Sequence, residues 1–295
     1  MKAPVVDHLN AEGAAELFND ATETLRSDPL RRGSCVVLPA TGRLVATGDL
    51  HDNPIHFQKV CAFAKLDRPD HHVILQELIH GERLTHGCDL SWRMLAKVAA
   101  LRLRHPGQVH PMLANHEIAQ AFLQPVSKGA GECTKLFRDG LEWSFGDDAG
   151  LVEEAVTGFI RAMPLAVRTE TGLLSAHSLP APAAMARFDP GVLGRALEDA
   201  DFAARTGSAW SMTWGRGQTP ETVGALAEAW GVRLFVLGHK HVEQGAETPF
   251  PGVVFLNSDH ERGAVIAFDL GKEPPTAEEA VQRAVPLNAL GSIDA

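Results

Sequence analysis

Short apolar runs alternate with amphipathic segments along the first part of the chain, and this alternation limits the folds that it can adopt. Runs rich in β-branched residues occupy 35–39, 43–50, 73–76 and 109–113. Segments with a helical apolar period lie at 54–66 and 89–104. Strand followed by helix in this order is typical of a parallel sheet covered by helices. We therefore predict an α/β fold, with a hairpin at Ala40-Thr41-Gly42 between the first two runs.

The remaining segments fit a single domain that spans residues 1–295. A peripheral helix is expected at about 11–27, because its apolar residues recur with a helical period and Pro29 cannot continue it. Residues 116–162 are mostly helical by the same pattern, with a loop at 128–131. Further strands are expected at 164–168, 173–177, 234–238, 253–257 and 264–268, with a helical insertion at about 183–230 and a polar tail from about 271. No repeat and no Ser/Gly-rich linker divides the chain.

The charge balance and the cysteines narrow the class of protein. The chain has 27 Lys and Arg against 37 Asp and Glu, a formal net charge of −10. This excludes a protein that holds long nucleic acid through overall positive charge. No segment approaches the roughly 18 consecutive apolar residues of a membrane span, and the N-terminus lacks a signal-peptide core. We expect a cytoplasmic protein without a membrane anchor, whose scattered Cys35, Cys61, Cys88 and Cys133 are reduced, buried thiols.

Side chains of the kinds that bind metals follow the predicted strands. They are Asp49, His51, Glu77, Asn115, His177, His239 and His241, with His116 beside Asn115. Ligands of open α/β sheets bind at the carboxyl ends of the strands. Carboxylate and imidazole ligands without a thiolate suit Mn²⁺, Fe²⁺, Zn²⁺ or Co²⁺. Seven candidate ligands exceed the three or four that one catalytic ion takes from protein, which favours two ions that share a bridge.

Four motifs give the chain a resemblance to the calcineurin-like metallophosphoesterases. GDLHDN at 48–53 is similar to the family's GDxH block, LANHE at 113–117 to GNHE, AHS at 176–178 to its isolated GH, and GHKH at 238–241 to GHxH, in family order. AHSLP at 176–180 and WGR at 214–216 resemble the branch of the phosphoprotein phosphatases and the bacterial diadenosine-polyphosphate hydrolases. The resemblance implies a four-layer α/β/β/α sandwich with two mixed sheets.

The resemblance also implies roles for individual residues. One divalent ion would be held by Asp49, His51 and His241, and the other by Asn115, His177 and His239. Glu77 would bridge the two ions, and His116 would be the general acid, which protonates the leaving oxygen or orients the nucleophile. Two such ions can clamp a phosphate and activate water for an in-line displacement. The implied reaction is hydrolysis of a phosphomonoester, either a phosphoprotein or a small phosphorylated metabolite.

The chain departs from the family at residues 76–81, where Gln-Glu-Leu-Ile-His-Gly replaces the GDxxDRG block. Glu77 is one methylene longer than the family's Asp, and pairing with an Arg is the alternative to a bridging role. His80 replaces the Asp that orients the catalytic His in phosphoprotein phosphatases; it is an orienting residue, a third-site ligand or simply buried. The phosphate-binding Arg of that block is missing. Arg216 is our candidate for that contact, against a surface ion pair.

Two other functions are compatible with these motifs. A phosphodiesterase or dinucleoside-polyphosphate hydrolase is the nearest enzymatic alternative. A non-catalytic, metal-binding regulatory relative would fit the altered block, although the retained His116 favours an enzyme. Asp52 and Asn53, next to the candidate ligand His51, are explained most simply as a helix cap before Pro54. Glu117 is expected to be a structural group. Residues 258–260 either line the site or form a polar turn.

Overall fold

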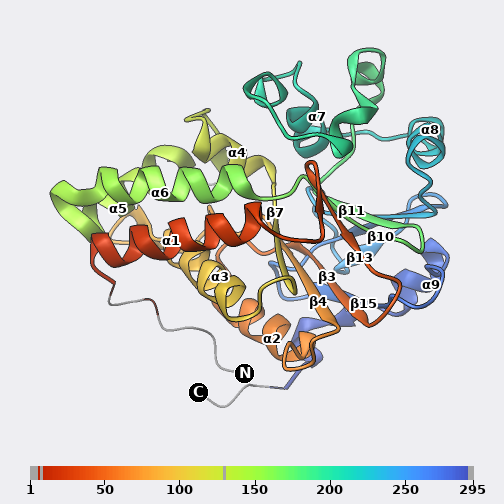
Figure 1. The fold of residues 1–295 in the computed structure, drawn as a ribbon, viewed down its shortest axis with the longest axis horizontal. Coiled ribbons are helices and arrows are strands. Elements are labelled where there is room, and N and C mark those ends of the chain that lie inside the picture. Colours follow the sequence, from red (N-terminus) through yellow and green to blue (C-terminus); the bar gives the residue numbers. More distant parts are fainter. Residues whose placement is uncertain (1–5, 7–8, 129–130, 292–295) are drawn as a thin grey trace.

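Two mixed β-sheets lie face to face at the centre of the molecule, with helices on their outer sides (Figure 1). The computed structural model describes residue 6 and residues 9–128 and 131–291. The first sheet has the order β16 (Val285–Pro286), β15 (Ala264–Asp269), β3 (Arg43–Asp49), β4 (His71–Gln76) and β7 (Val109–Met112). The second has the order β1 (Arg31–Arg32), β2 (Cys35–Leu38), β10 (Ala166–Thr169), β11 (Leu173–Ala176), β12 (Leu234–Leu237), β14 (Val253–Leu256) and β13 (Ala246–Glu247). Two short hairpins pair β5 (Leu84–Thr85) with β6 (Cys88–Asp89), and β8 (Ser127–Lys128) with β9 (Gly131–Glu132).

The core between the sheets receives alternate residues from each strand. Leu44 of β3 packs there with Leu234 and Val236 of β12. Their chain neighbours Val45 and Phe235 belong instead to the core under the outer helices. Successive side chains of a strand point to opposite faces, so a strand that is buried on both faces reads as a continuous apolar run. This explains why the strands are visible in the sequence as unbroken apolar segments.

The helices form the outer layers. On the side of the first sheet, α2 (Pro54–Ala64) and α3 (Trp92–Arg104) contact β3, β4 and β7, and α1 (Ala11–Arg26) packs on α3 and α6 (Ala149–Ala162). The remaining helices are α4 (Asn115–Ala121), α5 (Cys133–Phe145), α7 (Ser208–Trp214), α8 (Pro220–Trp230) and α9 (Ala277–Gln282). Short 3₁₀ segments span Gly146–Asp148, Pro182–Arg187, Pro190–Gly194, Asp199–Phe202 and Leu287–Ala289. The Trp230 ring of α8 lies 6.3 Å from Phe235 of β12, which places α8 over the second sheet. The predicted four-layer fold with two mixed sheets is thereby confirmed.

The predicted hairpin at Ala40-Thr41-Gly42 is wrong. β2 pairs in parallel with β10, whereas β3 pairs with β4 and β15, so the two consecutive strands lie in different sheets. Gly42 has a φ of 93°, and a Cβ at this position would lie 1.9 Å from the carbonyl oxygen of Asp70. The segment therefore carries the chain from one sheet to the facing one. Each strand is apolar on both faces, and such a pattern does not distinguish pairing within a sheet from packing between sheets.

The segment from residue 271 is folded and is not merely a polar tail. α9 buries Ala277 and Ala280 in the core between the sheets, and β16 pairs with β15. Thr276 and Glu279 form a capping box at the start of α9, a helix signal that the polar composition obscured. Residues 183–230 contain α7 and α8 together with short 3₁₀ segments. In the predicted loop at 128–131, residues 129 and 130 lie outside the described residues.

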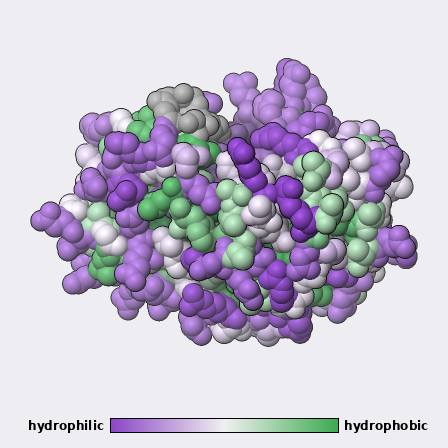
Figure 2. Space-filling model, turned by 90° about the horizontal axis from the view of Figure 1, so that it is seen from above, coloured by the Kyte–Doolittle hydropathy of each residue, from purple (hydrophilic) through white to green (hydrophobic). Residues whose placement is uncertain are grey.

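The face drawn in Figure 2 is mostly hydrophilic and carries small apolar patches. Among the residues that the structure describes, no helix combines the length and apolarity needed to cross a bilayer. The four cysteines all lie in the described part of the chain and form no disulfide; three of them are buried, and Cys88 is partly exposed.

Candidate metal centre

The two sheets approach each other closely at the edge where their central strands end. Asp49, the last residue of β3, forms a parallel bridge with Asn257, which follows β14. The carbonyl oxygen of Asp49 accepts a hydrogen bond of 3.1 Å from the backbone amide of Ser258. A Cβ at Gly48 would lie 1.8 Å from the carbonyl oxygen of Leu256. This approach brings the residues that follow β3, β4, β7, β11 and β12 to one place.

Glu77, which directly follows β4, faces imidazoles from three other segments. Its Oε2 lies 3.5 Å from Nε2 of His51 and 3.5 Å from Nε2 of His177, and its Oε1 lies 3.8 Å from Nε2 of His116. Ligand atoms of Asp49, Glu77 and His177 all lie within 4.8 Å of one another, and all three residues are buried. Two buried carboxylates at this separation repel each other, and a divalent cation between them would offset the repulsion. The donor set therefore fits a metal ion.

Asn115, the first residue of α4, joins two imidazoles from the second sheet. Its Oδ1 lies 2.8 Å from Nε2 of His177 and 3.0 Å from Nδ1 of His239. Burial lowers the pKa of His177 well below its usual value. Burial, followed by the positive charge of Arg216, lowers the pKa of His239 to about 3. Both rings are therefore neutral near pH ~7, which is the form in which imidazole binds metals.

Strained backbone is concentrated in these loops. Of the nine non-glycine residues with left-handed φ in the described chain, five lie here: His51, Asp52, Glu77, His80 and His239, with φ of 42°, 51°, 47°, 58° and 63°. Each such conformation costs about 1–3 kcal/mol and persists only where its surroundings hold it. The carbonyl oxygen of Glu77 accepts hydrogen bonds from the amides of Leu50 (3.1 Å) and His51 (2.7 Å). Strain held in place in this way is typical of functional sites.

His116 lies between Glu77 and His80. Its Nδ1 is 2.9 Å from Nδ1 of His80, and Nε2 of His80 is 3.2 Å from Oε1 of Gln120. A hydrogen bond between two imidazoles needs one protonated nitrogen and one bare nitrogen, so the pair shares a proton at this contact. His80 therefore lies where it can orient the His116 ring, and its place in a group with His116 and Cys133 keeps the role of a third-site ligand open.

Two of the predicted site residues lie at the rim of the cluster. His241 is exposed, and its ring packs 5.0 Å from that of His260, so the structure leaves it outside the buried group. Arg216 is exposed and lines a hollow of about 260 Å³ together with His239. A second hollow, of about 500 Å³, is lined by His51 and by His260. His260 therefore faces a space beside the cluster.

Gln76 is a supporting residue that sequence reasoning missed. Its Oε1 lies 2.9 Å from Nδ1 of His177, and its Nε2 donates a hydrogen bond of 2.8 Å to the carbonyl oxygen of Thr47. A partner on the second ring nitrogen fixes the orientation of a metal-binding imidazole. The signal in the sequence was a glutamine at the end of a buried apolar strand, because a buried amide needs partners.

The groups predicted to be structural have structural contacts. Asn53 caps α2, and its side chain accepts a hydrogen bond of 3.0 Å from the amide of His56. Asp52 does not cap the helix but pairs with Arg83 at 2.9 Å. Glu117 is fully buried and accepts a hydrogen bond of 2.7 Å from the amide of Leu78. Glu117 thus supports the backbone of the loop that carries Glu77.

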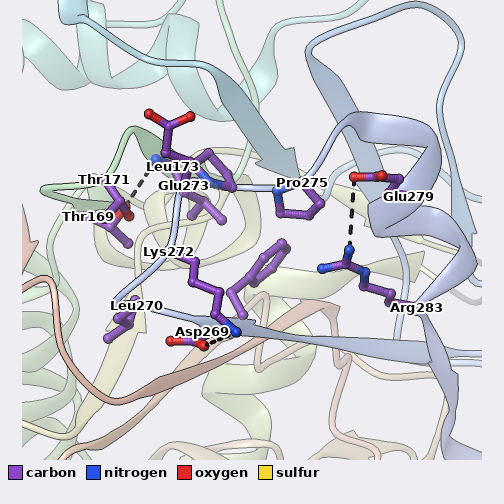
Figure 3. A pocket seen from close by; sticks show the side chains of 12 residues that line it. Thr169, Thr171, Leu173, Asp269, Leu270, Lys272, Glu273, Pro275, Glu279 and Arg283 are labelled. Carbon is purple, nitrogen blue, oxygen red and sulfur yellow. Dashed lines mark hydrogen bonds and ion pairs between the residues drawn. The ribbon is translucent and has the colours of Figure 1, made fainter.

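A separate hollow of about 310 Å³ lies at the opposite end of the strands (Figure 3). It includes Leu173, the first residue of β11, whereas the metal-type cluster follows the last residue of that strand. Its cations are paired, Lys272 with Asp269 at 3.0 Å and Arg283 with Glu279 at 3.9 Å. None of the predicted site residues lines this hollow, so it is not the predicted metal site.

Comparisons with known proteins bear on the fold. No protein-family model matches the sequence, and no curated protein matches it. A protein serine/threonine phosphatase from Saccharomyces cerevisiae with similarity to human phosphatase PP5 aligns with a TM-score of 0.64 at 15% identity, over 94% of this chain and 89% of that one. A cold-active protein-tyrosine phosphatase of a psychrophile, Shewanella sp., aligns with a TM-score of 0.59 at 13% identity, over 84% and 80%. The chain therefore shares its fold with these two phosphatases. The resemblance stated from the motifs is thus confirmed at the level of the fold.

Proposed function

We propose that this protein hydrolyses phosphomonoesters at a centre of two divalent metal ions. The observation that carries the proposal is the convergence of imidazoles from both sheets on the buried Glu77 carboxylate and the Asn115 amide. The proposed ligands are Asp49, His51 and His241 for one ion, Asn115, His177 and His239 for the other, and Glu77 for both. These donors suit Mn²⁺, Fe²⁺, Zn²⁺ or Co²⁺. When bound, the two ions would act as Lewis acids on the phosphate and lower the pKa of a water molecule.

His116 is the proposed general acid. Its Nε2 faces the Glu77 carboxylate at 3.8 Å, and its side chain is 10% exposed, so a substrate at the rim can reach it. As the P–O bond breaks, the proton on Nε2 passes to the leaving oxygen, which departs as an alcohol. The contact of 2.9 Å with His80 holds the ring in this orientation. His241, which now packs on His260, has to rotate inward to serve as a ligand.

Arg216 is the proposed phosphate contact. Arg216 lines the same hollow as His239, and its positive charge is, after burial, the next cause that lowers the pKa of His239. A guanidinium offers paired donors that match two phosphate oxygens. The hollow that it lines also carries Lys240 and two phenylalanine rings, Phe250 and Phe255, against which the organic part of a substrate could pack. The net charge of −10 does not oppose an anionic substrate, because local charges set the potential at the site.

Turnover by metal-stripped protein tests the proposal. A chromogenic phosphomonoester and a phosphodiester are supplied separately, and Mn²⁺, Fe²⁺, Zn²⁺, Co²⁺, Ni²⁺ and Mg²⁺ are added one at a time. We expect monoester hydrolysis to return with at least one ion. Hydrolysis of the diester alone would favour a phosphodiesterase or a dinucleoside-polyphosphate hydrolase. If neither substrate is hydrolysed with any of the ions, a non-catalytic, metal-binding regulatory protein is favoured.

The Arg216→Ala variant tests the phosphate contact separately. We expect a higher KM for the monoester, because charge-assisted bonds to the phosphate are lost in the ground state as well as in the transition state. Arg205→Ala, which removes an exposed arginine from the same insertion, is the matched control. If Arg216→Ala and Arg205→Ala have the same KM for the monoester, Arg216 does not contact the phosphate.

A further inference from the structure

A second group of metal-type side chains adjoins His116 on the side away from Glu77. It consists of His80, His116 and Cys133, whose ligand atoms all lie within 4.8 Å of one another. His116 presents its Nε2 to Glu77 and its Nδ1 to this group, where Nδ1 of His80 lies 2.9 Å away. All three residues are buried, with exposed fractions of 1%, 8% and 5%. The two-ion centre proposed above uses neither His80 nor Cys133 as a ligand.

Three different segments fix these side chains. Cys133 is the first residue of α5, and its backbone amide donates a hydrogen bond of 2.8 Å to the carbonyl oxygen of Val126. His80 lies in the loop after β4, with its ring edge-on to Phe137 at 5.9 Å, one turn after Cys133 on the same helix. Its Nε2 is 3.2 Å from Oε1 of Gln120. A partner on the nitrogen that faces away from the ion is typical of metal-binding imidazoles.

We propose that His80, His116 and Cys133 form a third metal site, which takes one borderline-soft divalent cation such as Zn²⁺. The ligand atoms are Nδ1 of each imidazole and the sulfur of Cys133. Bond lengths of about 2.0–2.1 Å to nitrogen and about 2.3 Å to sulfur separate the ligand atoms of a tetrahedral site by roughly 3.3–3.6 Å. The observed spacing requires only side-chain adjustment to reach that geometry. The thiol proton leaves to solvent when the thiolate binds the ion.

The third site differs from the two-ion centre in its chemistry. The two-ion centre offers carboxylate and amide oxygens with imidazole, whereas Cys133 adds a thiolate. A thiolate selects Zn²⁺ or Co²⁺ over Mn²⁺ and Mg²⁺, which prefer oxygen ligands. An ion here would replace the hydrogen bond between His80 and His116. With Nδ1 bound to the ion, the ring would keep only its Nε2 proton, so His116 would be a weaker acid while the third site is loaded. The third site does not depend on the proposed function, because its ligands would bind the ion whether or not the protein hydrolyses phosphate esters.

The absorption spectrum of the cobalt-loaded protein tests the third site. Metal-stripped, reduced protein is titrated with Co²⁺, and the near-ultraviolet charge-transfer band that a thiolate–cobalt bond produces is recorded. Elemental analysis of parallel samples measures the ions bound. We expect the band in the wild-type protein, and one more equivalent of Zn²⁺ than of Mn²⁺ at saturation. Absence of the band at saturating Co²⁺ would overturn the third site whatever the phosphatase assay shows.

Variants assign the band to Cys133. We expect Cys133→Ser to lose both the band and the extra equivalent of Zn²⁺, and the matched control Cys88→Ser, on a partly exposed cysteine, to keep both. A band that survives in folded Cys133→Ser would overturn the assignment. If Cys133→Ser fails to fold, His80→Gln decides the matter. It retains the thiol and should weaken Zn²⁺ binding at the extra site about 10-fold or more, and unchanged Zn²⁺ affinity would count against the proposal.

Discussion

The side-chain carboxylate of Asp49 accepts a hydrogen bond of 2.9 Å from the backbone amide of His239. Asp49 ends β3 in one sheet, and His239 follows β12 in the other, so this bond ties the two halves of the candidate centre together. Gly238 makes the approach possible, because a Cβ there would lie 2.4 Å from Oδ1 of Asp49 and 2.8 Å from Oε1 of Gln76. The glycine of the GHKH motif is thus required by the contact between the sheets.

Gly238→Ala should therefore damage the centre without touching a proposed ligand. We expect a loss of stability of about 1–3 kcal/mol, because the added methyl group must displace Asp49 or Gln76, and a loss of bound metal. Thermal unfolding and elemental analysis measure the two effects. Gly158→Ala in α6 is the matched control, since nothing lies within 4 Å of the added Cβ. A Gly238→Ala protein that keeps its metal and its stability would show that the strands are not held together here.

Glu77→Gln should cost at least one bound ion per chain. The substitution keeps the size of the side chain but removes the negative charge that offsets the repulsion between two cations at short separation. Glu77→Asp should also bind metal more weakly, because the backbone places the carboxylate for the longer arm. Glu278→Gln, on the exposed side of α9, is the control for the loss of one acidic charge. Two Mn²⁺ ions per chain with unchanged affinity in Glu77→Gln would show that Glu77 is not the bridge.

His116→Asn should lower kcat while the two-ion centre keeps its metal. General acid catalysis contributes about 10²–10⁴-fold, and the loss should shrink for esters with good leaving groups, which need little protonation. Steady-state kinetics with a series of leaving groups measures the trend, and Mn²⁺ content reports the centre itself. Loss of Mn²⁺, or an equal loss of kcat across the series, would contradict the role assigned to His116.

The strands were predictable because burial on both faces leaves a continuous apolar signal, but their pairing was not. Residues 35–38 and 43–49 are neighbours in sequence and lie in facing sheets, a choice made by contacts with β10 and β15 far along the chain. The folded segment after residue 271 was missed for a related reason. Half of its apolar residues are alanines, and two of these, Ala277 and Ala280, are buried in the core between the sheets.

Much of the candidate site was predictable because carboxylate, amide and imidazole side chains at strand ends carry their own signal. Asp49, Glu77 and His177 are brought together from three segments as the strand ends suggested. The sequence could not show that Gln76 supports His177 or that His80 contacts His116, because such contacts depend on side-chain positions across the fold. The outward position of His241 is equally a matter of local packing, here against His260.

Acid should destabilise the fold through a buried histidine pair remote from the candidate centre. His110 of β7 is 1% exposed, and its Nε2 lies 3.2 Å from Nδ1 of His72. Burial, and then the neighbouring charges of His72 and Arg102, lower the pKa of His110 well below its usual value. Burial also lowers the pKa of His72. Burial thus favours the neutral form of both imidazoles in the folded protein.

We expect the His110→Gln variant to lose stability less steeply in acid than the wild-type protein. Above the unfolded-state pKa of about 6.5 the imidazole is neutral in both states and contributes no pH dependence. Below this pKa the imidazole is protonated in the unfolded chain but stays neutral in the folded chain. The unfolding free energy therefore falls by up to about 1.4 kcal/mol per pH unit for each buried, neutral histidine. Denaturant unfolding of the metal-stripped protein from about pH 7 to about pH 5 measures this slope. His86→Gln, at an exposed histidine, should retain the wild-type slope, and an unchanged slope in His110→Gln would mean that His110 is protonated in the folded state.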